Sequence, residues 1–286
     1  MNLTRRDFFK TSAAVAGGVA LAGLAGEASW AGSAVTTEQT RSDAVLWFTE
    51  RGYEQVKPVS LVTGHQFNGG LAYDESLKPS PRAVFVVQPC ARVEDVRKRD
   101  VPGTLPLFEM LGFAPPSGTA APHRTALIVG FLTRRAGLDA GRLRITTTEL
   151  ARPLLPELAK FGVREAQVRM RPLDEARREG AGSGWFAPPG HPLGHAYATF
   201  SVEYVLSNGL ELEIAELGVD SSAALNGGGG IGLDRVTMAR NDRAASWKQS
   251  LPQFKQAVEE AAKHAHKPLP SGYYAILEVP EPKSHS

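Results

Sequence analysis

The sequence has little of what would stabilise it covalently or mark it as a nucleic-acid-binding protein. Its 286 residues include one cysteine, Cys90, so no disulfide can form within the chain and a packed core has to stabilise the fold. The formal net charge is only +2, whereas nucleic-acid-binding domains are strongly basic. The sequence also has no internal repeat and no long low-complexity tract. These features favour a globular protein without a nucleic-acid surface.

The N-terminal segment is apolar, but its apolar run is too short for a membrane anchor. Residues 11–26, TSAAVAGGVALAGLAG, are rich in glycine and fall short of the roughly 20 residues that a spanning helix needs. They follow TRRDFFK at 4–10 and precede the small residues of ASWAGSA at 28–34. This order resembles a twin-arginine export signal. We therefore expect residues 1–33 to be a cleaved signal peptide that engages the twin-arginine translocase, and a periplasmic or otherwise exported product without a stable membrane anchor.

The remaining residues, 34–286, are expected to form a single domain, because about 250 residues suffice to bury one large core. Apolar spacing and glycine stops predict helices over 40–52, 123–137, 150–162, 233–241 and 246–266. Runs rich in β-branched or aromatic residues predict strands over 55–63, 82–95, 105–113, 142–149, 165–172 and 272–279.

The clearest hairpin signal lies at 198–218. Two alternating runs flank Asn208 and Gly209, a residue pair favoured by a type I′ turn. In the second run apolar residues alternate with Glu211 and Glu213, so both carboxylates are expected on one face. Because strands are largely joined by hairpins and helices come in blocks, we predict an α+β fold, an antiparallel sheet flanked by helices.

The glycine-rich stretch GGGGIGLDR, residues 227–235, permits two interpretations. Three of its glycines satisfy G-x-G-x-x-G, the dinucleotide-binding fingerprint. That fingerprint needs a strand running directly into the glycines, and here VDSSAALN at 219–226 intervenes. No Gly-Lys-Ser or Gly-Lys-Thr follows, so a phosphate-binding P-loop is excluded as well. The second pattern, G-x-G-x-x-R from Gly230 to Arg235, remains.

With Arg235 included, three segments resemble alanyl-tRNA synthetase, a class II enzyme. QPCAR at 88–92, followed by LPLFEMLGF at 105–113, is similar to the family's second motif, a Q-x-C-x-R strand leading through a loop to F-F-E-M-L-G. GIGLDR at 230–235 looks like the third motif, G-M-G-L-E-R, and FTERGYEQVKPVSLV at 48–62 looks like the first helix and strand. The resemblance implies a class II synthetase-like catalytic core.

The resemblance also implies ATP-dependent activation of a small amino acid or other carboxylate as its adenylate. Arg92 matches the arginine that contacts the α-phosphate, where charge builds in the transition state. Phe108 matches the aromatic residue that stacks on adenine. Arg235 matches the arginine on the far phosphates, at a helix start whose dipole favours anions. Without the motifs, Phe108 would be read as core and the arginines as surface residues.

Other nucleotide-site residues follow from the resemblance and from strand alternation. Asp95 stands in the place of an acidic family residue, and Gly230 and Gly232 belong to the third motif. Glu211 or Glu213 is expected to hold Mg²⁺, which prefers carboxylate oxygens. The alternative is that these glutamates form a solvated sheet face.

Several departures from the family pattern change the expected substrate. Gly228 and Gly229 stand where the family has an aspartate that holds the ammonium group of the substrate. The chain stops where the family's tRNA-binding and editing domains would begin, and it contains no zinc-binding editing motif. Charging of tRNA is therefore not expected. A homodimer is expected by resemblance only.

The segment around Trp185 loosely resembles the family's wall of the amino-acid pocket. His191 and His195 are four residues apart, but an intervening proline and glycine oppose the helix that would align them on a metal, so no metal site is predicted. A pocket wall with a hydrogen-bonding histidine and a plain loop remain alternatives. Cys90 is interpreted as a buried strand cysteine rather than as a thiol activated by Arg92.

Three functions remain open from the sequence. The first is a stand-alone, ATP-dependent relative of the synthetase core. The second is an exported protein that binds a small ligand without turnover, since the compartment beyond the membrane holds little ATP. The third is an enzyme of another class that reuses the substrate pocket, with His191 or His195 as its base.

Overall fold

The structure is a computed structural model, and it describes residues 34–58, 61, 82–116, 118–186, 197–219, 228–247, 251–267 and 269. Within them lies a nine-stranded sheet of order β1-β2-β3-β9-β8-β7-β4-β5, with β6 paired to β7 off this path. The strands are β1 (Glu54–Gln55), β2 (Val84–Ala91), β3 (Leu107–Ala114), β4 (Leu143–Thr148), β5 (Val168–Arg171), β6 (Trp185–Phe186), β7 (Tyr197–Val205), β8 (Glu211–Gly218) and β9 (Gly229–Gly232).

The sheet is mainly antiparallel, as predicted. Parallel pairing occurs between β1 and β2 and between β4 and β5, and the other described pairings are antiparallel. The α-helices are α2 (Thr37–Thr49), α3 (Ala121–Gly130), α4 (Leu155–Ala159), α5 (Leu173–Glu179), α6 (Leu233–Arg240) and α7 (Leu251–Ala265). A short π-helix, η2 (Phe131–Arg135), follows α3. The 3₁₀ helices are η1 (Val93–Lys98), η3 (Ala140–Arg142), η4 (Glu149–Leu154) and η5 (Glu165–Gln167). The α+β fold class is thus confirmed.

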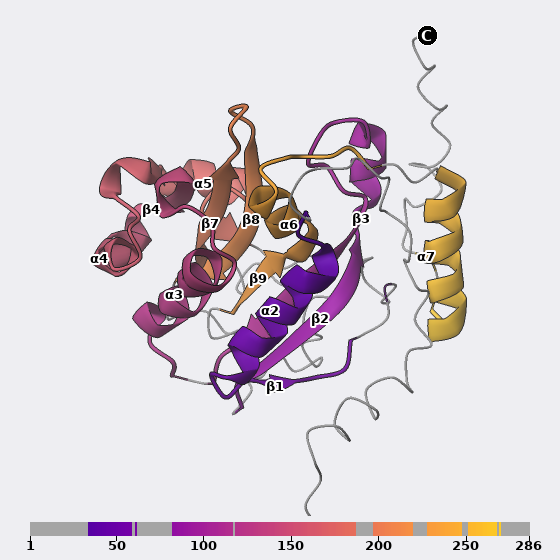
Figure 1. Cartoon of the computed structure of the whole chain (residues 1–286), viewed down its shortest axis with the longest axis horizontal. Helices are drawn as coiled ribbons and strands as arrows, with labels where there is room; N and C mark the ends of the chain where they lie inside the picture. Colours follow the sequence, from indigo (N-terminus) through magenta and orange to yellow (C-terminus); the bar gives the residue numbers. More distant parts are fainter. Residues whose placement is uncertain are drawn as a thin grey trace, which may run out of the picture. The chain divides into compact units, whose positions relative to one another are not determined.

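One face of the sheet is covered by α2, α3 and α6, and we call it the apolar face. Phe48 of α2 packs on Phe85 of β2 and Phe113 of β3, with ring centroids 5.5 and 5.4 Å away. Leu127 of α3 and Val236 of α6 belong to the same buried cluster. Figure 1 shows the indigo helix α2 lying against the sheet beside β2. A second, smaller cluster joins α7 to the ends of β2 and β3.

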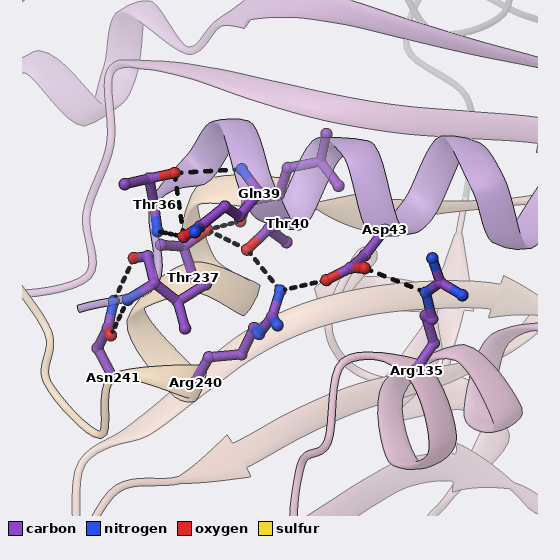
Figure 2. A network of polar contacts seen from close by, with 10 residues as sticks. Thr36, Gln39, Thr40, Asp43, Arg135, Thr237, Arg240 and Asn241 are labelled. Atoms are coloured by element: carbon purple, nitrogen blue, oxygen red, sulfur yellow. Dashed lines mark hydrogen bonds and ion pairs between the residues drawn. The ribbon is translucent and has the colours of Figure 1, made fainter. Parts of the chain in front are cut away.

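Helix α2 begins earlier than the predicted residue 40, because Thr36 caps it. The Thr36 hydroxyl accepts from the Gln39 N–H at 3.2 Å, and the Gln39 side chain accepts from the Thr36 N–H at 2.8 Å. The Asn241 side chain at the end of α6 bonds both the N–H and the C=O of Val35, at 2.9 and 2.8 Å. The start of the described chain is thereby fixed to α6 (Figure 2).

Several predicted elements are shorter than expected. The helix predicted over 150–162 divides into η4 and α4, because Pro153 and Pro156 cannot donate to a continuous helix. Of the strand predicted over 55–63, Gln55 lies in β1 and residues 56–58 and 61 are not in a strand, while residues 59, 60, 62 and 63 lie outside the described residues. Within the predicted helix 246–266, the described helical part is 251–265. The strand predicted over 272–279 lies outside the described residues.

The glycine stretch forms a strand rather than a flexible loop. Strand β9 lies between β3 and β8, where neighbouring backbones come very close. A Cβ on Gly229 would lie 2.5 Å from the Glu216 carbonyl oxygen, and one on Gly228 would lie 2.3 Å from that of Phe113. Glycine is needed here because the two neighbouring strands leave no room for a side chain.

Candidate functional site

The face opposite α2, α3 and α6 carries most of the predicted site, and we call it the polar face. Residues paired directly across strands have side chains on the same face. The pairs Cys90–Phe108 and Met110–Gly232 place parts of β2, β3 and β9 there. On the same face the register continues across β9, β8, β7 and β4 through Gly230, Glu216, Ser201 and Thr146.

A β-bulge in the hairpin changes which glutamates share this face. Val202 pairs with Ala215 and Glu203 pairs with Glu213, so Ile214 is the extra residue of β8. Beyond the bulge the alternation shifts by one residue, and Glu216 joins Glu213 and Glu211 on the polar face. Strict alternation predicted Glu211 and Glu213 there. It missed Glu216, because nothing in the sequence marks the bulge.

The structure brings Arg92, Phe108 and Arg235 together at one end of the polar face. The Arg92 guanidinium carbon lies 5.2 Å from the centroid of the Phe108 ring. Burial is the main cause that lowers the pKa of Arg235, the Arg92 charge lowers it further, and Glu213 and Asp95 raise it. Asp95, in η1, therefore also lies within electrostatic reach of Arg235.

Arg235 is held in place by two neighbouring segments. Its Nε donates to the Gly103 carbonyl at 3.2 Å, and its Nη1 donates to the Glu213 carbonyl at 3.2 Å and to the Glu213 carboxylate at 3.4 Å. It follows β9 directly and lies in the first turn of α6. The guanidinium is thus fixed before any ligand arrives, which limits the reorganisation that binding would need.

The two glutamates predicted to bind Mg²⁺ lie in different environments. Glu211 is gripped by Arg169 through two contacts of 2.8 and 2.5 Å, and this hydrogen bonding lowers its pKa. Glu213 contacts Arg235 and also lies beside Gly182, where an added Cβ would be 3.9 Å from its Oε1. Glu213 therefore belongs to the arginine cluster, whereas Glu211 belongs to a separate ion pair.

Glu216 is the most perturbed carboxyl group of the polar face. Its Oε1 accepts from the hydroxyls of Thr199 and Ser201 at 2.9 and 3.1 Å, and from the N–H of Gly182 at 3.4 Å. Burial, and secondly the charge of Glu213, raise its pKa to about 7. A carboxyl group that changes charge near neutral pH is typical of binding and catalytic sites.

Gln88 of β2 adds an unsatisfied polar atom on the same face. The residue is 1% exposed, and within the described structure its Oε1 accepts no hydrogen bond. Neighbouring Cys90 is buried, and burial raises its thiol pKa to about 12. The thiol is therefore protonated at neutral pH, which agrees with the interpretation as a strand cysteine.

The predicted substrate-pocket residues are only partly described. Trp185 lies in β6, paired with Ala198, and the Arg177 guanidinium carbon lies 4.8 Å from its ring centroid. The turn that precedes β6 supplies the Gly182 N–H to Glu216, so this segment does border the polar face. His191 and His195 lie outside the described residues.

Comparison with known proteins shows how the chain is exported. A family model described as the TAT (twin-arginine translocation) pathway signal sequence matches residues 2–22. The chain is exported through the twin-arginine pathway. In the part of the chain that the structure describes, no helix combines the length and apolar character needed to cross a bilayer. No curated protein matches the chain.

Two solved structures share a distant similarity with the chain. Apo histidyl-tRNA synthetase from S. aureus matches at 10% identity and a TM-score of 0.43, over 83% of this chain and 80% of that one. An ATP phosphoribosyltransferase regulatory subunit/histidyl-tRNA synthetase from Bacillus halodurans C matches at 10% identity and a TM-score of 0.42, over 86% and 92%. At this level the likeness assigns no function. The alanyl-tRNA synthetase resemblance and the homodimer stay predictions.

Proposed function

We propose that the exported chain binds ATP with Mg²⁺ on the polar face and activates a small carboxylate, an amino acid or another acid, as its adenylate. The observation that carries this proposal is the grouping of Arg92, Phe108 and Arg235 on one sheet face. Two cations on one sheet face, one of them beside an aromatic ring, match a ligand that has a flat base at one end and phosphates at the other.

Each residue has a distinct role in this proposal. The Phe108 ring offers a stacking surface, and the Arg92 guanidinium at 5.2 Å lies where a phosphate next to the stacked base would pass. Arg235 contacts the far phosphates, in an orientation fixed by Gly103 and Glu213. In the reaction a carboxylate oxygen bonds to the α-phosphorus, the bond from that phosphorus to the bridging oxygen breaks, and the electron pair leaves with pyrophosphate.

Glu213, rather than Glu211, is the proposed ligand for Mg²⁺. Its carboxylate lies beside Arg235, whereas both oxygens of Glu211 are engaged by Arg169. Magnesium prefers carboxylate oxygens and is usually shared between one or two protein carboxylates and the phosphates of the substrate. The metal would neutralise the phosphate charge that the two arginines leave uncompensated.

Calorimetric titration of Mg·ATP into the mature protein tests the nucleotide site. We expect micromolar binding by the wild type and no measurable binding by Arg92→Ala or Arg235→Ala. Arg152→Ala serves as the control, because Arg152 is exposed and its guanidinium pairs with Glu149. Pyrophosphate exchange over a panel of carboxylates then identifies the substrate. A wild type that does not bind Mg·ATP contradicts the proposal.

The export signal favours a second function, namely binding of a small ligand without turnover. Export places the chain in a compartment that holds little ATP. The unsatisfied Gln88 oxygen and the Glu216 carboxyl group could bind a ligand that carries hydrogen-bond donors. Mass spectrometry of gently purified protein should then detect a stoichiometric bound metabolite, and a protein that is consistently free of ligand would argue against this alternative.

A further inference from the structure

Two pairs of adjacent residues connect the polar face to the helix beneath the sheet. Phe108 and Arg235 lie on the polar face, and their chain neighbours Glu109 and Asp234 contact α2 on the other side. The Glu109 N–H donates to the Asp234 carboxylate at 2.6 Å. Strand β3 and the start of α6 are thus joined directly beneath the two proposed ligand residues.

Helix α2 fixes this junction through two side chains. Arg41 Nε donates to the Glu109 carboxylate at 2.6 Å, and the Thr37 hydroxyl donates to the Asp234 carboxylate at 3.1 Å. Thr37 and Arg41 are four residues apart and therefore share one face of the helix. We call Thr37, Arg41, Glu109 and Asp234 the α2 clamp.

The clamp carboxyl groups are costly for the stability of the fold. Burial is the main cause that raises the pKa of both Glu109 and Asp234, so their partners do not fully offset the loss of water. Well-packed apolar residues could join α2 to the sheet with equal or greater stability. Such a cost is typical of groups that fix a geometry rather than strengthen a core.

We propose that Arg41 is a positioning residue for the nucleotide site. Arg41 holds the Glu109 carboxylate, and the Glu109 backbone N–H in turn holds the Asp234 carboxylate. Through these two contacts, Arg41 sets the distance and orientation between the Phe108 ring and the Arg235 guanidinium. The inference rests on the proposed function, in which these two groups bind opposite ends of ATP. Neither Arg41 nor Thr37 is among the residues assigned to contact the ligand.

A second polar network on α2 supplies a matched control. Asp43 accepts from Arg135 Nε at 3.1 Å and from Arg240 Nη1 at 2.9 Å, and Arg240 also donates to Thr40 at 3.2 Å (Figure 2). This network joins α2 to η2 and to the last turn of α6, away from β3. Its burial is comparable, with the side chain of Asp43 26% exposed against 37% for Arg41 and 21% for Glu109.

The test compares the mature chains carrying Arg41→Met, Arg41→Lys and Asp43→Asn. We expect the Kd for Mg·ATP to rise about tenfold in Arg41→Met, a loss comparable to that of one good hydrogen bond to the ligand. Arg41→Lys should restore part of the affinity. Asp43→Asn should lower the melting temperature to a similar extent but leave the Kd for Mg·ATP within about twofold. The reason is that its partners, Arg135 and Arg240, are not clamp residues, and substitutions without shared partners act independently.

A second readout examines the site without nucleotide. Para-fluorophenylalanine at position 108 should give one sharp ¹⁹F resonance in the wild type and in Asp43→Asn, and a shifted or broadened resonance in Arg41→Met. If neither the Kd nor the resonance responds more to Arg41→Met than to Asp43→Asn, the positioning role is wrong. If the wild type does not bind Mg·ATP, the proposed function is wrong, and the resonance alone decides whether Arg41 positions the ring.

Discussion

The two faces of the sheet are built on opposite principles. On the apolar face, large side chains such as Phe48, Phe85 and Phe113 are fully buried and pack on one another. On the polar face, Glu216 has a strongly raised pKa and a Gln88 oxygen lacks a partner within the described structure. The apolar face accounts for stability. The polar face keeps groups that cost stability, which is expected where a protein binds or transforms a ligand.

The largest effect should come from comparing one aromatic residue on each face. Phe113→Ala empties a fully buried position that contacts Phe48 and Tyr53, and it should lower the free energy of unfolding by about 3–5 kcal/mol. Phe108→Ala, on the partly exposed polar face, should cost no more than about 1–2 kcal/mol yet abolish Mg·ATP binding. Urea unfolding and calorimetry measure both quantities. Equal stability losses would erase the distinction between the faces.

The next effect concerns the pH dependence caused by Glu216. Its pKa is raised from 4.5 to about 7 in the folded state, so the native protein holds this proton more tightly than the unfolded chain does. Stability should therefore fall as pH rises through that interval, by about 2–3 kcal/mol from this group.

The measurement is urea unfolding of the wild type and of Glu216→Gln at about pH 5 and about pH 8. Glutamine keeps an oxygen for the hydroxyls of Thr199 and Ser201 but does not ionise, so the variant should lose most of this pH dependence. If both proteins show the same slope, Glu216 is not the group responsible.

The smallest effect tests the close approach of strands at β9. Gly229→Ala forces a Cβ to within 2.5 Å of a backbone oxygen and 2.9 Å of the Phe113 ring, and it should cost about 1–3 kcal/mol. Gly232→Ala is the control on the same strand, because its Cβ would meet its nearest atoms at 3.8 Å. Thermal unfolding compares the two. A Gly232 variant as unstable as the Gly229 variant would show that glycine is needed for another reason.

The sequence predicted those elements whose signal is local. The hairpin formed where alternation predicted it, but its turn is not the expected type I′ turn, because Gly209 has a positive φ of +85° and Asn208 does not. The Leu206 N–H donates to the Leu210 carbonyl and the Gly209 N–H donates to the Leu206 carbonyl, so residues 207–209 form a three-residue loop with glycine in the left-handed position. The grouping of Arg92, Phe108 and Arg235 was anticipated from motif order. Their roles toward ATP stay predictions.

The features that were missed depend on tertiary contacts. Strand β9 has no β-forming residues apart from Ile231, and it exists because β3 and β8 approach too closely for side chains. Glu216 was missed because a bulge, which no residue pattern announces, reverses the alternation after Ile214. The α2 clamp was missed because its members are 68 and 197 residues apart in sequence.

The capped start of α2 has a consequence for maturation of the exported chain. The cap residue Thr36 and the clamp residue Thr37 follow the expected end of the signal peptide, residue 33, almost directly. Proteolytic trimming by four residues beyond that point would remove the cap, the Thr37 contact to Asp234 and the Val35 contacts to Asn241. If the α2 clamp positions the site as proposed, accurate signal cleavage and an intact N-terminus are conditions for its formation, and mass determination of the mature protein should precede any binding measurement.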